Sequence, residues 1–377
     1  MTYPIPIAEA LMRRALQLAK RGQGCVEPNP PVGAVVVDDS GNILGEGWHH
    51  TFGGPHAEIY ALTAAGDSAR GATLFVTLEP CCHFGKTPPC SRAVIAAGIR
   101  RVIVAMRDPA PHVDGGGIQE LRDGGIEVEV GLLEHDANRL TAPFIQLMTK
   151  RRPWFHAKWA MTLDGKTASR TGHSQWISNE SARVIVHRLR GRMDAILVGI
   201  GTVLADDPLL TARPPGPRLA TRIVLDSHAS ISTDSQLVRT AAQSPVLIIT
   251  TSQAPVPQCE KLRAAGVEVL NIECDSAGHP TLSLVAEILG QRQISNVLLE
   301  GGSRILGAFF DAQLIDEVHA FIAPKIVGGS TAASPLAGRG LDLIPTEMSL
   351  DHPIIESLDG DIYLQGQIRR KPKIGPG

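Results

Sequence analysis

Hydrophobic residues recur along the chain in two alternating patterns, a spacing of three to four residues and short apolar runs, and together these predict an α/β fold. Leu11, Ala15, Leu18 and Ala19 predict a first helix over 7–21. The elements expected after it are strands over 32–37 and 43–48, a helix over 56–65, a strand over 73–78, a helix over 91–97, a strand over 101–105, a helix over 118–123 and a strand over 127–130. Their order predicts a hairpin followed by β-α-β units, which is a mixed sheet covered by helices.

The pattern changes in a basic, proline-bounded stretch over 140–153. We place a domain boundary there, which gives one domain over 1–148 and a second over 149–370. The second domain is expected to contain strands over 154–161, 195–199, 222–225, 245–250, 267–272, 296–300, 317–322 and 362–368, and helices over 179–192, 259–265, 282–289 and 304–313. Ser178 is the expected N-cap of the first of these helices. Apolar strands that alternate with helices predict a largely parallel sheet.

The first candidate chemistry combines a histidine with two cysteines. His56 is expected to begin a helix, Cys81 follows a predicted strand, and Cys90 comes immediately before another predicted helix. One imidazole and two thiolates fill three corners of a tetrahedral zinc site and leave the fourth for water, which is typical of catalytic zinc. Glu58 lies two residues after His56, where a carboxylate that is not a ligand can transfer protons. This His-x-Glu and Pro-Cys arrangement is the zinc deaminase signature.

The simpler interpretation is that these cysteines are buried small hydrophobic residues. Against it stands the combination of a strand, a Pro-Cys pair, a Gly/Pro-rich loop and a second Cys at a helix start, where the helix dipole favours a thiolate. Cys82 is adjacent to Cys81 and too close along the chain to share a metal with it easily, so we predict Cys81 and Cys90 as the ligands.

Composition restricts the class of protein further. At 377 residues the chain exceeds what one compact core usually supports, which favours two domains. A formal net charge of −2 with scattered Lys and Arg argues against a nucleic-acid partner. Six cysteines are too few for a disulfide scaffold, and neither a signal peptide nor an apolar stretch of the roughly 20 residues that cross a bilayer is visible. We therefore expect a cytoplasmic protein without a membrane partner.

A second candidate site lies where predicted strands of the second domain end. Gly301 and Gly302 form a strand-to-helix turn that would let backbone amides approach a phosphate, although many such turns need glycine only for their geometry. The dinucleotide pattern Gly-x-Gly-x-x-Gly is absent. Lys158, Asp164 and the stretch over 202–208 are further candidates, because ligands of open α/β sheets collect at strand ends. From spacing alone, these charged residues could equally belong to solvated loops.

Over roughly residues 8–368 the sequence resembles the bifunctional deaminase-reductases of riboflavin biosynthesis. The similarity lies in Pro28-Asn29-Pro30, Gly45-Glu46-Gly47-Trp48-His49, Pro55-His56-Ala57-Glu58 and Thr77-Leu78-Glu79-Pro80-Cys81 in the first half, and in Leu163-Asp164-Gly165, Ser174-Gln175-Trp176-Ile177, residues 202–208, Leu225-Asp226-Ser227, Glu300-Gly301-Gly302 and Ala323-Pro324-Lys325 in the second. The resemblance implies a cytidine-deaminase-like α/β/α domain followed by a dihydrofolate-reductase-like α/β domain.

The resemblance also implies roles for individual residues. In the first domain His56, Cys81 and Cys90 would hold one zinc ion and Glu58 would be the proton shuttle, the same four residues that the spacing indicates. The substrate contacts implied there are Asn29, His49, His83 and Lys86. The NADPH contacts implied in the second domain are Ala160, Trp176, Thr202, Asp206, Ser227, Gly302, Ser303, Arg304, Ile305, Leu306, Gly307 and Ala308. The substrate contacts implied there are Ser174, Arg190, Leu210, Arg213 and Glu300, with Lys158 taking part in the reduction.

The reaction implied is the zinc-dependent deamination of 2,5-diamino-6-(5-phosphoribosylamino)pyrimidin-4(3H)-one, followed by NADPH-dependent reduction of the ribosyl to the ribityl side chain. Arg190 and Arg213 would suit the substrate phosphate, because a guanidinium fork matches phosphate oxygens. A homo-oligomer, a dimer or tetramer, is also expected. Two alternatives stay open: an enzyme in which only the deaminase is active and the second domain binds a nucleotide without catalysis, and a deaminase whose second domain docks RNA.

The sequence departs from the family pattern at three positions. Cys82 stands where Ser is common, Phe84 where His is often found, and Thr162 replaces a Ser before Leu163-Asp164-Gly165. The first two lie in the predicted metal loop and affect its polar contacts, whereas the predicted ligands are intact. Thr162 keeps the hydroxyl group.

Overall fold

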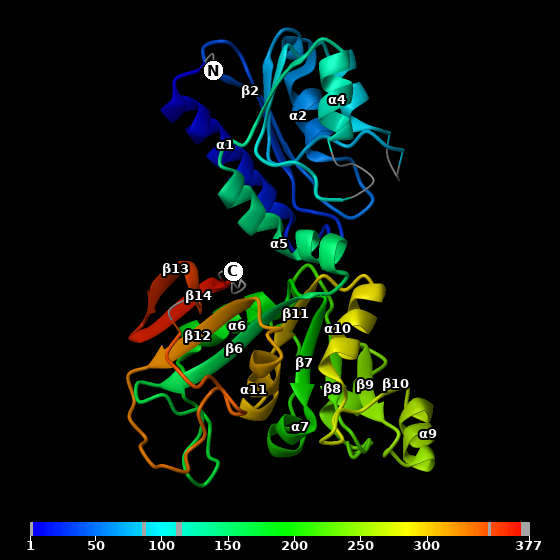
Figure 1. Ribbon diagram of the computed structural model, residues 1–377, viewed down its shortest axis with the longest axis vertical. Coiled ribbons are helices and arrows are strands. Elements are labelled where there is room, and N and C mark those ends of the chain that lie inside the picture. The colour runs from blue at the N-terminus through cyan, green and yellow to red at the C-terminus, as the bar shows by residue number, and fades with distance from the viewer. Residues whose placement is uncertain (1–2, 85–87, 111–114, 346–347, 371–377) are drawn as a thin grey trace, which may run out of the picture. The chain divides into compact units, whose positions relative to one another are not determined.

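The computed structural model describes residues 3–84, 88–110, 115–345 and 348–370. The chain divides into two compact units, Met1–Arg151 and Arg152–Gly377, each with its own sheet (Figure 1). The last helix of the first unit continues to Lys150, so the predicted boundary near residue 149 falls inside its final turn.

The first unit is built on a five-stranded mixed sheet in the order β2-β1-β3-β4-β5. Its strands are β1 (Gly33–Val37), β2 (Ile43–Trp48), β3 (Thr73–Val76), β4 (Arg101–Val104) and β5 (Glu127–Val130). β1 is antiparallel to β2 and β3, as the predicted hairpin requires, whereas β3, β4 and β5 are parallel. The helices are α1 (Ile5–Ala19), η1 (Lys20–Gly22), α2 (Ala57–Ala65), η2 (Gly66–Ala69), α3 (Cys90–Ala96), α4 (Gly116–Asp123) and α5 (Glu134–Lys150).

Helices cover both faces of this sheet, with α1 and α5 on one side and α2 and α4 on the other (Figure 1). Glycines in the strands allow the closest approaches. A Cβ added to Gly33 would lie 2.0 Å from the carbonyl oxygen of Ala15 in α1, and one added to Gly47 would lie 2.3 Å from that of Ala57 in α2. Since any larger residue would displace α2, Gly47 helps to fix the helix that begins beside His56.

The sequence did not predict α5, the longest helix of the unit. We interpreted Pro143 and the basic residues after it as a break in structure, but Pro143 lies inside the helix. The buried positions of α5 include Ala137, Leu140 and Leu147, and this apolar stripe stabilises the helix by packing against the first core. Burial therefore outweighs the hydrogen bond that the proline removes.

The second unit contains a nine-stranded sheet in the order β10-β9-β8-β7-β11-β6-β12-β14-β13. Its strands are β6 (Trp154–Thr162), β7 (Ala195–Gly199), β8 (Thr221–Leu225), β9 (Val246–Thr251), β10 (Glu268–Ile272), β11 (Asn296–Leu299), β12 (Glu317–Ala323), β13 (Met348–Leu358) and β14 (Asp361–Arg370). Pairing is parallel from β10 to β12 and antiparallel for β14 and β13, so the largely parallel sheet is confirmed. The edge strand β13 was not predicted.

Two apolar cores lie on opposite faces of the larger sheet. The helices of the unit are α6 (Glu180–Arg190), α7 (Ile200–Asp206), α8 (Gln236–Arg239), α9 (Val256–Ala264), α10 (Leu282–Gln291) and α11 (Ser303–Asp311). Residues of α6, α8 and α9 form one core, and residues of α10 and α11 form the other. The predicted N-cap of α6 was wrong by one position, because the side chain of Asn179 rather than Ser178 accepts the hydrogen bond from the Ala182 amide, at 2.9 Å.

Candidate active sites

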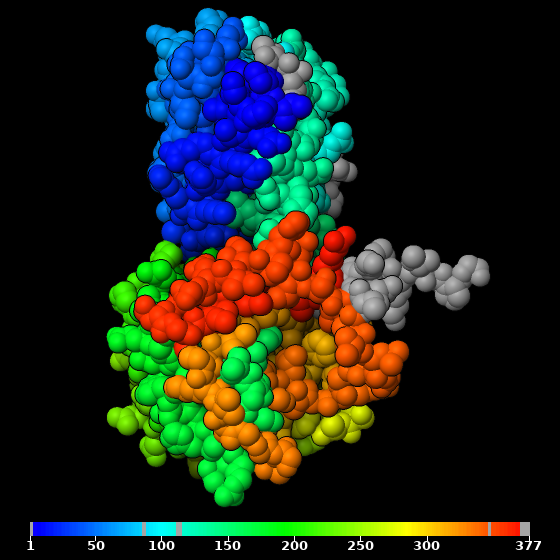
Figure 2. Space-filling view, turned by 90° about the vertical axis from the view of Figure 1, so that its left-hand side faces the viewer, coloured from blue at the N-terminus to red at the C-terminus, as the bar shows by residue number. Residues whose placement is uncertain are grey.

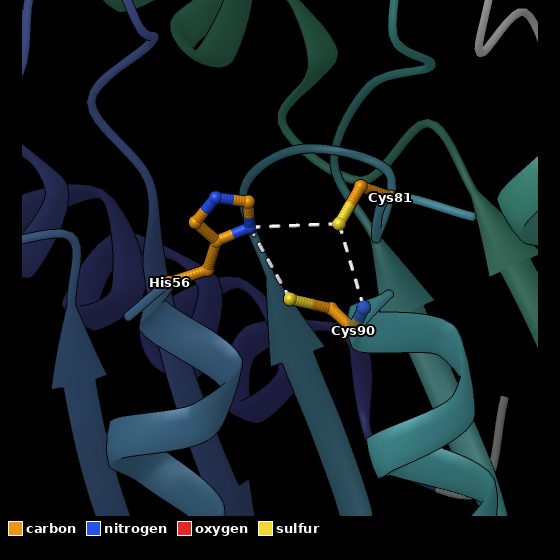
Figure 3. Close-up of side chains that lie close together, drawn as sticks. All are labelled: His56, Cys81 and Cys90. Atoms are coloured by element: carbon orange, nitrogen blue, oxygen red, sulfur yellow. Dashed lines mark hydrogen bonds between the residues drawn. The ribbon is translucent and has the colours of Figure 1, made fainter. Parts of the chain in front are cut away.

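In the first unit, one histidine and two cysteines converge near the end of β3 (Figure 3). The Nδ1 atom of His56 lies 3.5 Å from Sγ of Cys81 and 3.3 Å from Sγ of Cys90. The three atoms all lie within 4.8 Å of one another, which is close enough for one metal ion to contact all three. Two sulfurs and one imidazole nitrogen are a donor set that zinc takes in catalytic sites, so the group fits a zinc ion.

Local structure explains why these side chains meet. His56 is the N-cap of α2, and Cys90 is the first residue of α3. From the sequence, we expected the N-terminus of α3 to favour a thiolate on Cys90. In the structure, the backbone amide of Cys90 donates to Sγ of Cys81 at 3.4 Å, so the N-terminus of α3 favours a thiolate on Cys81 instead. The Cys90 thiol lowers the pKa of Cys81 most, burial opposes this, and His56 and the Cys90 amide lower it further.

Glu58 lies in the first turn of α2 and is 3 % exposed. Its Oε2 atom is buried and has no hydrogen-bond partner among the described residues, which is unusual because a buried polar atom normally has one. Burial raises the pKa of Glu58, and the neighbouring His56 partly opposes this. Such an oxygen, two residues from a candidate metal ligand, suits a group that exchanges protons with a bound molecule.

The position of Cys81 depends on a residue that sequence reasoning missed. Glu79 is 3 % exposed, and its carboxylate accepts hydrogen bonds from four backbone amides. Oε1 accepts from Gly117 at 2.9 Å and Ile118 at 3.1 Å, and Oε2 accepts from Asp108 and Gly115, both at 3.2 Å. The carboxylate therefore ties the segment before Cys81 to the N-terminus of α4. The feature of the sequence that could have identified Glu79 is its position directly before Pro80-Cys81.

Replacing Glu79 with Ala is expected to lower the melting temperature of the first unit by about 10 °C, because four backbone amides, most of them buried, lose a charged acceptor. The affinity for zinc should fall as well, since the segment that carries Cys81 loses its anchor. Calorimetry of the full chain and zinc competition with a chelator measure the two effects. The control is Glu127→Ala, which removes an exposed carboxylate paired with Arg101 and should change the melting temperature little. Equal melting temperatures for the two variants would contradict the role of Glu79.

The predicted substrate contacts of the first unit lie in different surroundings. His49 is 2 % exposed, its Nδ1 is 3.0 Å from the carbonyl oxygen of Pro55, and its ring meets His56 edge to face at 5.2 Å between centroids. The Nδ2 atom of Asn29 is 3.5 Å from Nε2 of His49, so both residues lie beside the metal group. His83 is exposed. Lys86 lies outside the described residues.

Cys82 does not belong to the metal group. A Cβ added to Gly116 would lie 2.9 Å from Sγ of Cys82, which places this sulfur against the start of α4. Burial raises the pKa of the Cys82 thiol, so it stays protonated near neutral pH. The structure therefore places the two adjacent cysteines in different surroundings, Cys81 beside His56 and Cys82 beside Gly116.

In the second unit a cleft of about 1490 Å³ opens along the carboxyl ends of the parallel strands, where ligands of open α/β sheets bind. Of the residues expected to contact NADPH, the following line it: Ala160, Trp176, Thr202, Asp206, Ser227, Gly302, Ser303, Arg304, Ile305, Leu306 and Ala308. The residues expected to contact substrate or take part in reduction also line it: Lys158, Ser174, Arg190, Leu210, Arg213 and Glu300. Gly307 does not, because it packs against Ala337, whose carbonyl oxygen would lie 1.7 Å from an added Cβ.

The turn after β11 has the features of an anion site. Gly302 is the N-cap of α11 and offers no side chain to cap it, so amides of the first turn remain available to a ligand. The amide of Gly302 donates to Oγ1 of Thr202 at 2.9 Å, which joins this turn to α7. A Cβ added to Gly302 would meet no described atom closer than 3.6 Å, so the space above the turn is open. The arrangement fits a phosphate group of a dinucleotide.

Glu300 forms a buried ionic group with two of the predicted residues. Nε of Arg190 is 2.6 Å and Nη2 is 2.9 Å from the Glu300 carboxylate, and Nζ of Lys158 is 3.5 Å from it. Burial raises the pKa of Glu300, but the charges of Arg190 and Lys158 outweigh this and lower it to about 2. The Arg190 fork is therefore occupied by a carboxylate, contrary to the expectation that it receives the substrate phosphate. Arg213 is exposed and also lines the cleft.

Comparison with known proteins identifies the family of each unit. The family model described as RibD C-terminal domain matches residues 153–362, and the model described as cytidine and deoxycytidylate deaminase zinc-binding region matches residues 6–106. The riboflavin biosynthesis protein RibD of Actinobacillus pleuropneumoniae is 42% identical over 353 residues, which cover 94% of this chain and 93% of the relative. The chain belongs to the RibD family.

Solved RibD structures have the same fold over nearly the whole chain. RibD from Acinetobacter baumannii is 34% identical, with a TM-score of 0.84, and the match covers 98% of this chain and 100% of that one. The deaminase/reductase from Thermotoga maritima is 38% identical, with a TM-score of 0.83, and the match covers 97% and 99%. The expected deaminase-like and reductase α/β domains are thereby confirmed.

As a member of this family, the chain is a bifunctional enzyme of riboflavin biosynthesis that combines a zinc-dependent deaminase with an NADPH-dependent reductase. This favours the bifunctional prediction over the deaminase-only alternative. Its substrate is a small molecule. Among the residues that the structure describes, no helix combines the length and apolar character that crossing a membrane requires.

Proposed function

We propose that the first unit deaminates 2,5-diamino-6-(5-phosphoribosylamino)pyrimidin-4(3H)-one and that the second unit then reduces the ribosyl group of the product to a ribityl group. The proposal rests above all on one observation: a zinc-type donor set with a buried carboxylate and a cleft fitted for a dinucleotide occur in the same chain. The name of the Thermotoga maritima relative, a diaminohydroxyphosphoribosylaminopyrimidine deaminase/5-amino-6-(5-phosphoribosylamino)uracil reductase, supplies the substrate class.

In the deaminase, His56, Cys81 and Cys90 would hold zinc, which makes a water molecule reactive near neutral pH. Glu58 would take the proton from that water and pass it to the leaving amine, so that ammonia departs and a carbonyl replaces the amine. The buried Oε2 atom of Glu58 is available for this transfer. His49 and Asn29 would orient the pyrimidine beside Glu58, since both are held by contacts around His56.

In the reductase, NADPH supplies the hydride, and the residues of the chain position the reactants. The turn at Gly302 and the side chains of Thr202 and Ser227 would hold the cofactor along the strand ends. Arg213 would bind the substrate phosphate. Lys158 would lie near C1′ of the ribosyl group, where an ammonium group paired with Glu300 can donate a proton while the hydride arrives.

A coupled assay on the purified full chain tests both activities. With the proposed substrate, we expect release of ammonia followed by consumption of NADPH; with the deaminated product alone, NADPH consumption should occur without ammonia release. Ammonia release without any NADPH consumption would contradict the reductase assignment. No ammonia from a zinc-loaded protein would contradict the deaminase assignment.

Replacing Lys158 with Met is expected to lower the reductase rate about 10²-fold or more while leaving the deaminase rate unchanged, because the ammonium beside Glu300 is lost but the side-chain volume is kept. Single-turnover NADPH oxidation, started from the deaminated product, measures the effect. Lys166→Met is the control, since Nζ of Lys166 points to the carbonyl oxygen of Ala332 at 3.5 Å and Lys166 does not line the cleft. Similar rates in the two variants would contradict the role of Lys158.

We also propose that the chain forms a homo-oligomer in the cytoplasm. β13 is an edge strand, and exposed isoleucines lie on it and its neighbour, with Ile354 43%, Ile355 65% and Ile362 43% exposed. These strands form part of the surface of the second unit (Figure 2), and apolar residues on an open edge are commonly covered by another chain.

All six cysteines lie in described segments and are free, which suits a reducing compartment. Sedimentation of the full chain tests the oligomer, and a monomer at micromolar concentration would exclude it.

A further inference from the structure

A second group of metal-type ligands lies inside the reductase unit, outside the cleft. His156 on β6 and His319 on β12 place Nδ1 and Nε2 3.3 Å apart. The Glu317 carboxylate lies 3.7 Å from Nδ1 of His156 and 3.4 Å from Nε2 of His319. The side chains are 5%, 16% and 0% exposed for His156, Glu317 and His319. Neither catalytic function described above uses these residues.

Outer hydrogen bonds determine the tautomer of His156. The side-chain amide of Asn296 donates to Oγ of Ser295 at 3.0 Å, and that hydroxyl donates to Asp194 at 2.7 Å. Oδ1 of Asn296 is therefore the atom that faces Nε2 of His156, at 3.1 Å, and it can only accept. The Nε2 atom of neutral His156 carries the proton, which leaves a lone pair on Nδ1.

The same reasoning applies to His319. The hydroxyl of Tyr363 donates to Gln365 at 2.7 Å, so its oxygen accepts from Nδ1 of His319, also at 2.7 Å. A lone pair then remains on Nε2 of His319, the atom that faces His156. Nδ1 of His156, Nε2 of His319 and the Glu317 carboxylate are therefore three acceptors that face one another. Nε1 of Trp154 donates to Oε2 of Glu317 at 3.2 Å, the oxygen that lies 3.7 Å from Nδ1 of His156. A carboxylate oxygen has two lone pairs, so it can accept this bond and still face an ion.

We propose that His156, Glu317 and His319 bind a second divalent transition-metal ion, of the zinc type, that joins β6 to β12. A cation satisfies three facing acceptors that otherwise repel one another, and imidazole nitrogen with a carboxylate oxygen is a donor set that zinc accepts. Asn296 and Tyr363 complete the site, because metal-binding histidines usually donate their other N–H group to a carbonyl or similar acceptor.

The spacing supports a tetrahedral ion. Bonds of about 2.0–2.1 Å from zinc to nitrogen and oxygen separate two tetrahedral ligands by roughly 3.3 Å. The two imidazole nitrogens are 3.3 Å apart, as this requires, and the Glu317 carboxylate approaches them with Oε1 at 3.4 Å from His319 and Oε2 at 3.7 Å from His156. His156 and Glu317 are paired directly across β6 and β12, so the ion would hold the two strands together next to Lys158, which is paired with His319. Three protein ligands would leave the fourth position of the ion to water. Since none of the three residues lines the cleft, the expected role is to join the strands rather than to take part in the reduction.

A shared proton is the competing occupant of the group. It would convert one imidazole to an imidazolium, which burial disfavours: burial lowers the pKa of His156, and it lowers that of His319 to about 3. The Glu317 charge partly opposes this lowering of the pKa in both residues. The zinc content of the protein distinguishes a metal ion from a shared proton at this group.

The experiment measures zinc by elemental analysis on the full chain, after incubation with zinc chloride and removal of loosely bound metal. We expect about two zinc ions per wild-type chain. The Cys81→Ser/Cys90→Ser double variant, which loses the deaminase ligands, should retain about one, and His156→Gln/His319→Gln should also retain about one. His173→Ala is the matched control, because it removes an exposed imidazole of the same unit and should retain both ions.

One zinc ion per wild-type chain, absent from the cysteine variant, would overturn the proposal and leave the deaminase site unaffected. Two ions that persist in the histidine variant would overturn it as well, since the second ion would then lie elsewhere. Circular dichroism establishes that each variant is folded. If the histidine variant does not fold, the wild type and the cysteine variant still decide the question through their zinc content.

Discussion

Replacing Glu58 with Gln is expected to lower the deaminase rate about 10²–10⁴-fold while the zinc content of the first unit stays unchanged. The glutamine would keep the shape of the side chain but could not take a proton from the attacking water. The zinc ligands are separate residues, so the metal should remain. Ammonia release and metal analysis on the same preparation measure the two effects.

Two controls make this result specific to Glu58. Reduction of the deaminated intermediate by NADPH should proceed at the wild-type rate in the variant, because the reductase residues belong to the other unit. Glu127→Gln changes an exposed carboxylate of the same unit and should retain both activities. Deamination at the wild-type rate in Glu58→Gln would refute the proton-transfer role of this carboxylate.

Replacing Cys90 with Ala is expected to remove both the zinc ion of the first unit and all measurable deaminase activity. Only His56 and Cys81 would remain of the three described ligands, and two protein ligands are fewer than catalytic zinc sites use. The reductase should stay active on the deaminated intermediate. Zinc content, ammonia release and NADPH consumption measure these three outcomes.

Cys82→Ala is the matched control for Cys90→Ala, since it removes a neighbouring thiol that packs against Gly116 and does not belong to the metal group. It should retain zinc and deaminase activity. Loss of metal from Cys82→Ala, with retention in Cys90→Ala, would show that the assignment of the ligands is wrong. The control matters because the sequence places Cys82 next to Cys81.

Regular elements with a clear apolar period were predictable from the sequence alone. The hairpin of β1 and β2 and the parallel strands of the second unit followed from alternation and apolar runs, because these patterns reflect burial on one or both faces of a sheet. The edge strand β13 escaped prediction, since most of its residues are exposed and carry no apolar period. α5 escaped because Pro143 suggested a break that tertiary packing overrides.

The sequence by itself also indicated the chemistry of the first site. The order His56, Glu58, Cys81 and Cys90 indicated a zinc deaminase, because ligand type and spacing largely define such a site. The geometry now brings the three ligand atoms within 4.8 Å of one another. The proton-transfer role of Glu58 remains a prediction that Glu58→Gln tests, and the substrate contacts remain predictions as well.

Only the tertiary structure decided which charged groups meet. Glu79 receives four amides from a segment that begins 29 residues later, and Arg190 pairs with Glu300 across 110 residues of chain. His156 and His319, separated by 163 residues, face each other because β6 and β12 are neighbours in the sheet. Local patterns reveal which face of an element is buried, but the partner of a buried charge depends on strand order, which long-range packing determines.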